Sequence, residues 1–160
     1  MQSVAGRLQA KFLRSLDDGA TSVEVARVAI LLWRNIDAAL SPAIGRAGVR
    51  VLLRRSLHLM WGVHPWLATC RKHAENETAF DALQSAFASQ SAEEAIQGNL
   101  ALLQAFSDVL ASIIGVSLSR QLLLSVSPPR SRFFHEKDPP SYTWSERKST
   151  AYTFQGSASP

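Results

Sequence analysis

The sequence predicts an all-α fold, a compact bundle of about six to seven helices with a disordered C-terminal tail. Up to residue 126, apolar side chains recur three and four residues apart, which is the spacing of one helix face. No stretch alternates apolar and polar residues for long enough to form a strand. Beyond that point the chain is rich in Ser, Thr and Pro and has no helical period. We therefore expect a helical bundle domain, 1–126, and a flexible tail, 127–160.

Three helices are expected in the first part of the bundle, over about 3–16, 21–41 and 42–61. The second begins with Thr21 and Glu24, which have the spacing of a capping box. A Ser-Pro pair then ends it and begins the third, since Pro suits the first turn of a helix. The buried face of the third is expected to carry Ile44, Ala47, Val51, Leu52 and Leu59.

The second part of the bundle begins after Gly62 with a short helix over about 65–73. A helix that ends near residue 89 follows. A second capping-box pattern, Ser91 and Glu94, then opens the longest apolar stripe in the chain. That stripe reaches Ile113, and a last short helix after Gly115 ends before two consecutive prolines.

The tail has one feature that does not suit a passive linker, because it holds six aromatic side chains, and disordered segments are usually poor in them. These are Phe133, Phe134, Tyr142, Trp144, Tyr152 and Phe154. Two interpretations stay open: a mobile extension, or a segment that docks on a partner or back onto the bundle.

Positive charge gathers in the middle of the chain, because residues 38–74 contain no acidic side chain and several arginines. Arginines at four-residue steps form a stripe on the expected helix 42–61, with leucines beside it. We predict that this basic, leucine-rich face, together with the long helix expected over 92–114, binds a protein partner or a second copy of the chain. Its expected residues are Arg46, Arg50, Arg54, Arg55, Leu53 and Leu57.

The same stripe leaves a weak nucleic-acid or anionic-membrane binder as an alternative. The residues between the arginines are Val, Leu and Ser rather than Asn or Gln, which argues against reading of base edges.

His58, Trp61 and His64 cluster around a turn and could hold a small molecule or a haem, which gives a sensor domain as a second alternative. The competing interpretation is a packing cluster with imidazoles bonded to helix ends. Cys70, His73 and Glu77 could share a helix face and offer zinc ligands, but a fourth ligand is not evident and we predict no metal site. We expect no bound cofactor.

Catalytic motifs are missing from the sequence: it has no nucleophile elbow and no Gly-rich phosphate loop. No second carboxylate pairs with Asp108 for acid–base chemistry. We therefore expect a protein that is not an enzyme.

The longest strongly apolar run, 28–33, is far too short to span a membrane. The lone Cys70 cannot form an internal disulfide. We expect a cytoplasmic protein. Residues 1–16 lack acids and carry Arg and Lys at helical spacing, so a mitochondrial targeting segment is the alternative.

Two segments carry a resemblance to known proteins: Ile44–Leu59 followed by His64–Leu67, and Leu110–Leu123. In their spacing of Leu, Arg and Gly they are similar to small all-helical bacterial proteins that have no assigned activity. The resemblance covers about residues 3–126 and implies an intracellular helical domain, without catalytic residues to carry over. With the basic face, it leads us to expect a non-enzymatic interaction or regulatory module.

Overall fold

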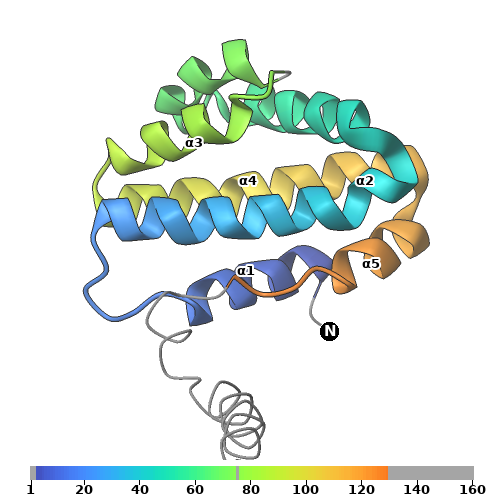
Figure 1. The fold of residues 1–160 in the computed structure, drawn as a ribbon, viewed down its shortest axis with the longest axis horizontal. Coiled ribbons are helices and arrows are strands. Elements are labelled where there is room, and N and C mark those ends of the chain that lie inside the picture. Colours follow the sequence, from blue (N-terminus) through green and yellow to red (C-terminus); the bar gives the residue numbers. More distant parts are fainter. Residues whose placement is uncertain (1–2, 75, 130–160) are drawn as a thin grey trace, which may run out of the picture. The chain divides into compact units, whose positions relative to one another are not determined.

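The computed structural model describes residues 3–74 and 76–129, which fold into six helices and no strand (Figure 1). The bounds of the helices in chain order are α1 Val4–Arg14, α2 Ser22–Met60, the 3₁₀ helix η1 Pro65–His73, α3 Ala79–Ala88, α4 Ala92–Ile114 and α5 Val116–Leu124. The predicted all-α class is confirmed. Most of the predicted tail, 130–160, with its aromatic residues, lies outside the described part of the chain.

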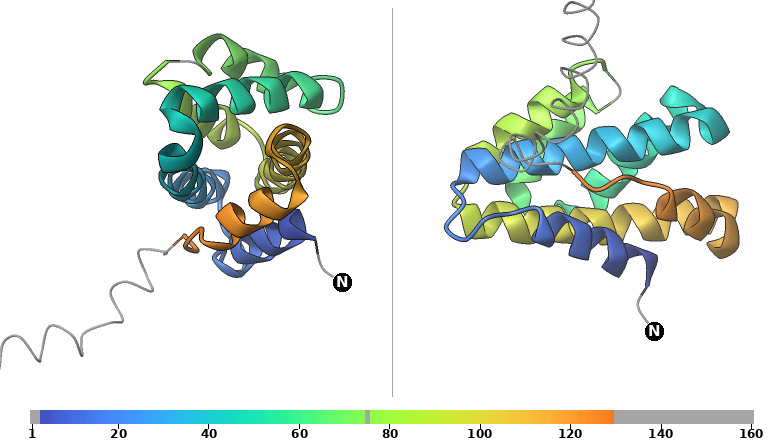
Figure 2. Two further views of the ribbon diagram at one scale, coloured as in Figure 1. Left: turned by 90° about the vertical axis from the view of Figure 1, so that its right-hand side faces the viewer. Right: turned by 60° about the horizontal axis from the view of Figure 1, so that its bottom comes forward.

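The helices lie in three tiers (Figures 1 and 2). The first half of α2 packs along α4 in the middle tier. Helices α1 and α5 pack against α4 on one side. The second half of α2, η1 and α3 form the tier on the other side. This last tier carries most of the residues that we discuss below as a functional surface.

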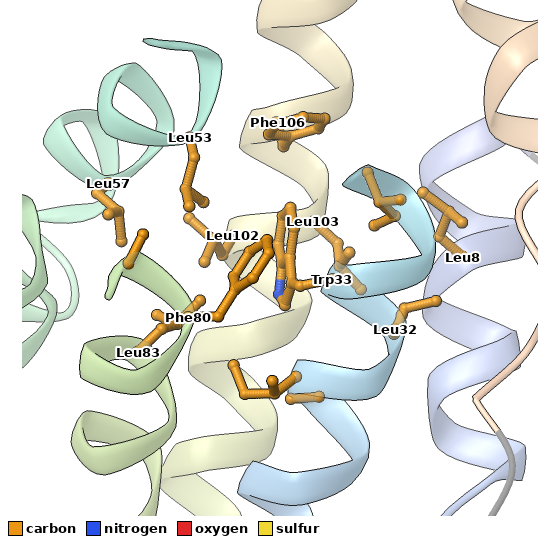
Figure 3. Packing of buried hydrophobic residues seen from close by; sticks show 14 of the residues in the cluster. Leu8, Leu32, Trp33, Leu53, Leu57, Phe80, Leu83, Leu102, Leu103 and Phe106 are labelled. Atoms are coloured by element: carbon orange, nitrogen blue, oxygen red, sulfur yellow. The ribbon is translucent and has the colours of Figure 1, made fainter. Parts of the chain in front are cut away.

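The core contains an aromatic pair between the two central helices (Figure 3). Trp33 of α2 meets Phe106 of α4 edge to face, with ring centroids 5.1 Å apart. The Trp33 indole N–H also donates to Oδ1 of the buried Asn99 at 2.8 Å. Because a buried polar group needs a partner, this bond favours one register of α2 on α4.

The long helix α2 changes direction at Gly45, where the backbone leaves helical geometry with φ 80° and ψ 156°. Glycine tolerates this positive φ, which side chains with a Cβ rarely adopt. The predicted boundary at Pro42 is therefore wrong by three residues, since the helix runs through the proline to Ile44. Figure 1 shows the second half turning back over the bundle.

The turn at Gly45 gives the second half of α2 a buried face different from the predicted one. Its buried apolar residues are Val49, Leu52, Leu53 and Leu57. Val51 and Leu59, which we expected in the core, are exposed. Of the predicted set only Leu52 is buried, while Ile44 is half-buried and Ala47 is exposed.

The segment after α5 returns along α1 and α2. Lys11 Nζ donates to the carbonyl of Val126 at 2.6 Å, and Val126 is buried. Ser15 Oγ donates to the carbonyl of Pro129 at 3.0 Å, and Asn35 Nδ2 to that of Ser127 at 3.0 Å. Residues 127–129 therefore pack on the bundle, although we assigned them to the tail.

Candidate functional site

A shallow pocket of about 360 Å³ lies between the second half of α2 and η1. Its lining residues are Val51, Arg54, Arg55, His58 and Arg71. None of them is acidic, and three carry a permanent positive charge. We call these five residues the basic pocket.

Two aromatic rings hold one wall of the basic pocket in place. Arg71 Nη1 lies 3.0 Å from His58 Nδ1, and the Arg71 guanidinium stacks over the Trp61 ring at 5.0 Å. A guanidinium can only donate, so His58 Nδ1 is the acceptor in this contact. His58 and Trp61 also touch edge to face, with centroids 6.0 Å apart. Arg71 is thus aligned by two separate contacts.

Exposed apolar side chains lie on the pocket and along the nearby end of α2. Val51 lines the pocket and is 55% exposed, and Trp61 is 46% exposed. Leu59 and Val63, close to Trp61 in sequence, are exposed as well. We call Val51, Leu59, Trp61 and Val63 the apolar rim. Apolar side chains gathered beside a charged pocket are typical of interaction surfaces.

The predicted partner face is only partly at the surface. Arg46, Arg54 and Arg55 are exposed, and Arg46 pairs with Glu77 at 3.8 Å. Leu53 and Leu57 are 1% exposed and point into the packed interior, as Figure 3 shows. The prediction that Leu53 and Leu57 lie on a partner surface is therefore wrong, because the second half of α2 buries the side that carries both leucines.

Arg50 also leaves the predicted face, since it is 8% exposed. Its Nη2 lies 3.8 Å from Asp37 Oδ2, and its guanidinium stacks on Phe80 at 4.5 Å. Asp37 belongs to the first half of α2, so this ion pair joins the two halves across Gly45. A buried charge needs such a partner. Arg50 therefore serves the fold and not a partner surface.

His64 does not share the surroundings of His58. It is 8% exposed, and its Nδ1 lies 2.9 Å from Glu94 Oε1. The Trp66 indole N–H donates to the same oxygen at 3.1 Å. These two bonds, first from Trp66 and then from His64, lower the pKa of Glu94. The three residues expected to form one ligand site are thus separated, since His58 and Trp61 lie at the surface and His64 is buried. This separation does not favour a haem site shared by all three.

At the start of α4 only the Ser91 half of the predicted capping box is present, because the carboxylate of Glu94 bonds other residues. Ser91 Oγ accepts from the Glu94 backbone N–H at 3.1 Å, as a capping box requires. The Glu94 side chain, however, turns to His64 and Trp66. At the start of α2, by contrast, both halves of the predicted Thr21–Glu24 box are present.

Trp66 fits against the backbone of α4 at Gly98. A Cβ built on Gly98 would lie 2.5 Å from Cζ2 and 2.7 Å from Cη2 of the Trp66 ring. The ring also meets Phe87 edge to face, with centroids 5.6 Å apart. Only glycine leaves room for this contact, which anchors η1 to α4.

Cys70 is buried, and burial raises the pKa of its thiol to about 11. Its Sγ lies 3.6 Å from the carbonyl oxygen of Ala82, to which it donates. A protonated thiol is a poor metal ligand and a poor nucleophile. Within the described residues, no three His, Cys, Asp or Glu side chains gather in a way that could hold a metal ion.

A second pocket, of about 450 Å³, lies where the α1–α2 loop meets the start of α4. Its lining combines apolar residues such as Leu13 and Ile96 with three carboxylates, Asp17, Asp18 and Glu93. None of its described lining residues is basic. The described charged residues of the two pockets therefore have opposite sign.

The sequence pointed to part of the basic pocket and missed the rest. Arg54 and Arg55 were expected at a partner surface, whereas Arg71 and Val51 were not. A signal for Arg71 existed, because it lies in the same acid-free segment, 38–74.

Comparison with protein-family models, with curated proteins and with solved structures found no match for this chain. Across the part of the chain that the structure describes, no helix is both long and apolar enough to cross a bilayer. The cytoplasmic location and its mitochondrial alternative stay predictions.

Proposed function

We propose that the protein is a non-enzymatic interaction module that binds an acidic protein segment through the basic pocket and the apolar rim. The observation that carries this proposal is the pocket itself. Three arginines from two helices line one hollow beside exposed Val51 and Trp61, and none of the described lining residues is acidic. The N–H donors of the pocket suit an anionic group, and its hydrocarbon walls suit an apolar side chain next to that group.

The chemistry of the pocket residues supports a protein partner. Arginine binds carboxylates through two parallel N–H bonds, which gives orientation as well as affinity. Trp and Arg are the residues most enriched where interface binding energy concentrates. Trp61 and Arg71 are already stacked on each other, so neither needs to be ordered on binding.

The alternatives predict different measurements. Binding of nucleic acid would weaken steeply as salt is added, because phosphate contacts release counterions. A haem sensor would show a visible absorption band on the purified protein.

Self-association is favoured by a separate observation, the opposite sign of the described charged residues in the two pockets. In this second candidate function the acidic lining of Asp17, Asp18 and Glu93 would face the basic pocket of another copy. Sedimentation equilibrium tests it. A mass that stays monomeric over a wide concentration range would exclude it.

The main proposal is tested with a photo-crosslinking amino acid in place of Leu59, which is exposed and follows the pocket residue His58 on α2. The full chain is irradiated in a cell extract, and the crosslinked segment is identified by mass spectrometry. We expect an acidic segment, and we expect its capture to fall at least tenfold in the double variant Arg54→Glu/Arg55→Glu.

A matched control reverses two exposed arginines on other helices, Arg7→Glu/Arg120→Glu. It changes the net charge equally and leaves the basic pocket intact. Capture should stay at the level of the unchanged protein. If both double variants lose capture alike, or neither does, the basic pocket is not the docking site.

A further inference from the structure

We propose that the pocket between the α1–α2 loop and the start of α4 is a second docking site, which binds a basic segment of a partner protein that carries a large apolar side chain. We call it the acidic pocket. Its carboxylates are those of Asp17, Asp18 and Glu93, and its apolar residues are Leu13, Leu16, Ala20, Ala92 and Ile96. No described residue lines both this pocket and the basic pocket, so the inference does not depend on the function proposed above.

The walls of the acidic pocket are apolar and rest on the core. Four of the wall residues are half-buried and pack against the core cluster, namely Leu16, Ala20, Ala92 and Ile96. Leu13 also lines the pocket and is 45% exposed. The volume of about 450 Å³ is in the lower part of the range of ligand sites, about 300–1,000 Å³. The pocket can therefore take up one large apolar side chain and withdraw it from water.

The carboxylates of the acidic pocket determine the charge of the segment that fits it. Asp17 and Asp18 come from the α1–α2 loop, and Glu93 comes from the first turn of α4. All three are exposed, and among the residues that the structure describes none forms an ion pair with them. The chain has a formal net charge of +4, yet this one hollow gathers three acids. A cationic partner is therefore the complementary one at this place.

The different exposure of the two kinds of residue favours a peptide over a small organic cation. The apolar walls are mostly half-buried, whereas the acids are exposed. The group that enters the pocket should therefore be uncharged, while its positive charges stay at the surface and keep part of their hydration. A peptide meets both requirements with separate side chains, because an apolar residue can stand between Lys or Arg residues. Apolar contact then contributes affinity, and the opposite charges contribute orientation and a faster association.

The test uses three peptide libraries with random ends and a fixed central triplet, Lys-Leu-Lys, Lys-Ser-Lys or Gln-Leu-Gln. Binding of the full chain is measured at constant salt. We expect the Lys-Leu-Lys library to bind at least about tenfold more tightly than Lys-Ser-Lys, because burial of one leucine side chain corresponds to about that ratio. Gln-Leu-Gln lacks the positive charges and should bind at least about fivefold more weakly than Lys-Leu-Lys.

A pair of charge variants places the binding at the acidic pocket. Asp17→Asn/Asp18→Asn removes two of its carboxylates and should weaken binding of the Lys-Leu-Lys library at least about fivefold. The matched control, Glu77→Gln/Asp108→Asn, removes two exposed acids that do not line the pocket. This control should bind like the unchanged protein.

A second pair of variants tests the apolar wall. Leu13→Ser changes a wall residue that is 45% exposed, and Leu118→Ser changes a leucine of α5 that is 43% exposed. Both positions are at the surface, so both variants should keep the helix content of the unchanged protein in circular dichroism. We expect Leu13→Ser to weaken binding of the Lys-Leu-Lys library at least about threefold, and Leu118→Ser to leave it unchanged.

Several results would overturn the inference. Equal affinity for the Lys-Leu-Lys and Lys-Ser-Lys libraries would show attraction by charge alone, without docking of an apolar side chain. Equal affinity of each variant and its control would place the binding elsewhere on the chain. Absence of binding by all three libraries would exclude a basic segment as the ligand. Self-association of the full chain that disappears in Asp17→Asn/Asp18→Asn would show that a second copy, and not another protein, occupies the pocket.

Discussion

Replacing Gly98 with alanine should destabilise the protein, although alanine is the better helix former. In an open helix interior the change would contribute about 1 kcal/mol of stability. Here the new Cβ would lie 2.5 Å from Trp66 Cζ2, and an ordinary carbon–carbon contact is about 3.5–4.0 Å, so the ring must retreat by about 1 Å. Overpacking of this kind costs about 1–3 kcal/mol.

Retreat of the ring also disturbs its hydrogen bond to Glu94, which adds to the loss. The losses exceed the gain, and we expect a net cost of about 1–2 kcal/mol. Urea unfolding followed by circular dichroism measures it. With a slope of about 2 kcal/mol per molar, the midpoint should fall by about 0.5–1 M.

Gly48→Ala is the matched control, because its Cβ would meet only the Ile44 side chain, at 3.4 Å or more. This variant should gain about 0.5–1 kcal/mol. In a Trp66→Leu background, Gly98→Ala should lose most of its cost, since the clashing ring is gone. The reasoning is refuted if Gly98→Ala is as stable as Gly48→Ala, or if its cost is unchanged without the indole.

Three further outcomes follow from buried or bonded ionisable groups. Asp37→Ala should lower the free energy of unfolding in urea by about 2–3 kcal/mol, because it leaves the buried Arg50 without its ion-pair partner. Arg50→Met should change that free energy by less than about 1 kcal/mol. Equal costs of the two variants would contradict this prediction. The pKa of Cys70 is raised from 9.0 to about 11, so the stability that this thiol contributes is present below pH 9 and is lost as the pH rises toward 11. Its alkylation by iodoacetamide at pH 8 should be slow until urea unfolds the protein. The pKa of Glu94 is lowered by folding, so its contribution is present above about pH 4.5 and is lost as the pH falls below that value. Glu94→Gln should be less stable at pH 7 and should lose less stability than the unchanged protein between about pH 5 and 3.

The local chemistry of the sequence was sufficient to place most helices. Thr21 and Ser91 each cap a helix as their spacing predicted, and the apolar period indicated the helical bodies. These signals act within one or two turns, so they can be read without knowing the fold.

The interior of α2 shows where local chemistry is not enough. Proline and glycine both interrupt helices, and only the packed structure decides that the chain turns at Gly45 and not at Pro42. That choice fixes which side of the second half is buried. Leu53 and Leu57 therefore entered the core, and Val51 came to the surface.

The candidate site required long-range contacts that no local pattern contains. In the sequence Arg50 cannot be distinguished from the other arginines of the stripe, because only the fold places Asp37 and Phe80 beside it. Arg71 joined Arg54 and Arg55 because η1 folds back on α2. In the sequence Glu94 has the spacing of an ordinary capping residue, and only the fold shows that its carboxylate bonds His64 and Trp66.

The contact of Trp66 with Gly98 has a consequence for how related sequences can diverge. The two residues lie on different helices, yet neither can change alone without a clash or a gap. A lineage that acquires a side chain at position 98 should therefore carry a smaller residue at position 66. Where the indole is lost, the residue at position 94 should also change more freely, since one of the two side chains that bond its carboxylate has gone. Coordinated change at these three positions would show that the packing of η1 on α4 is kept where sequences diverge.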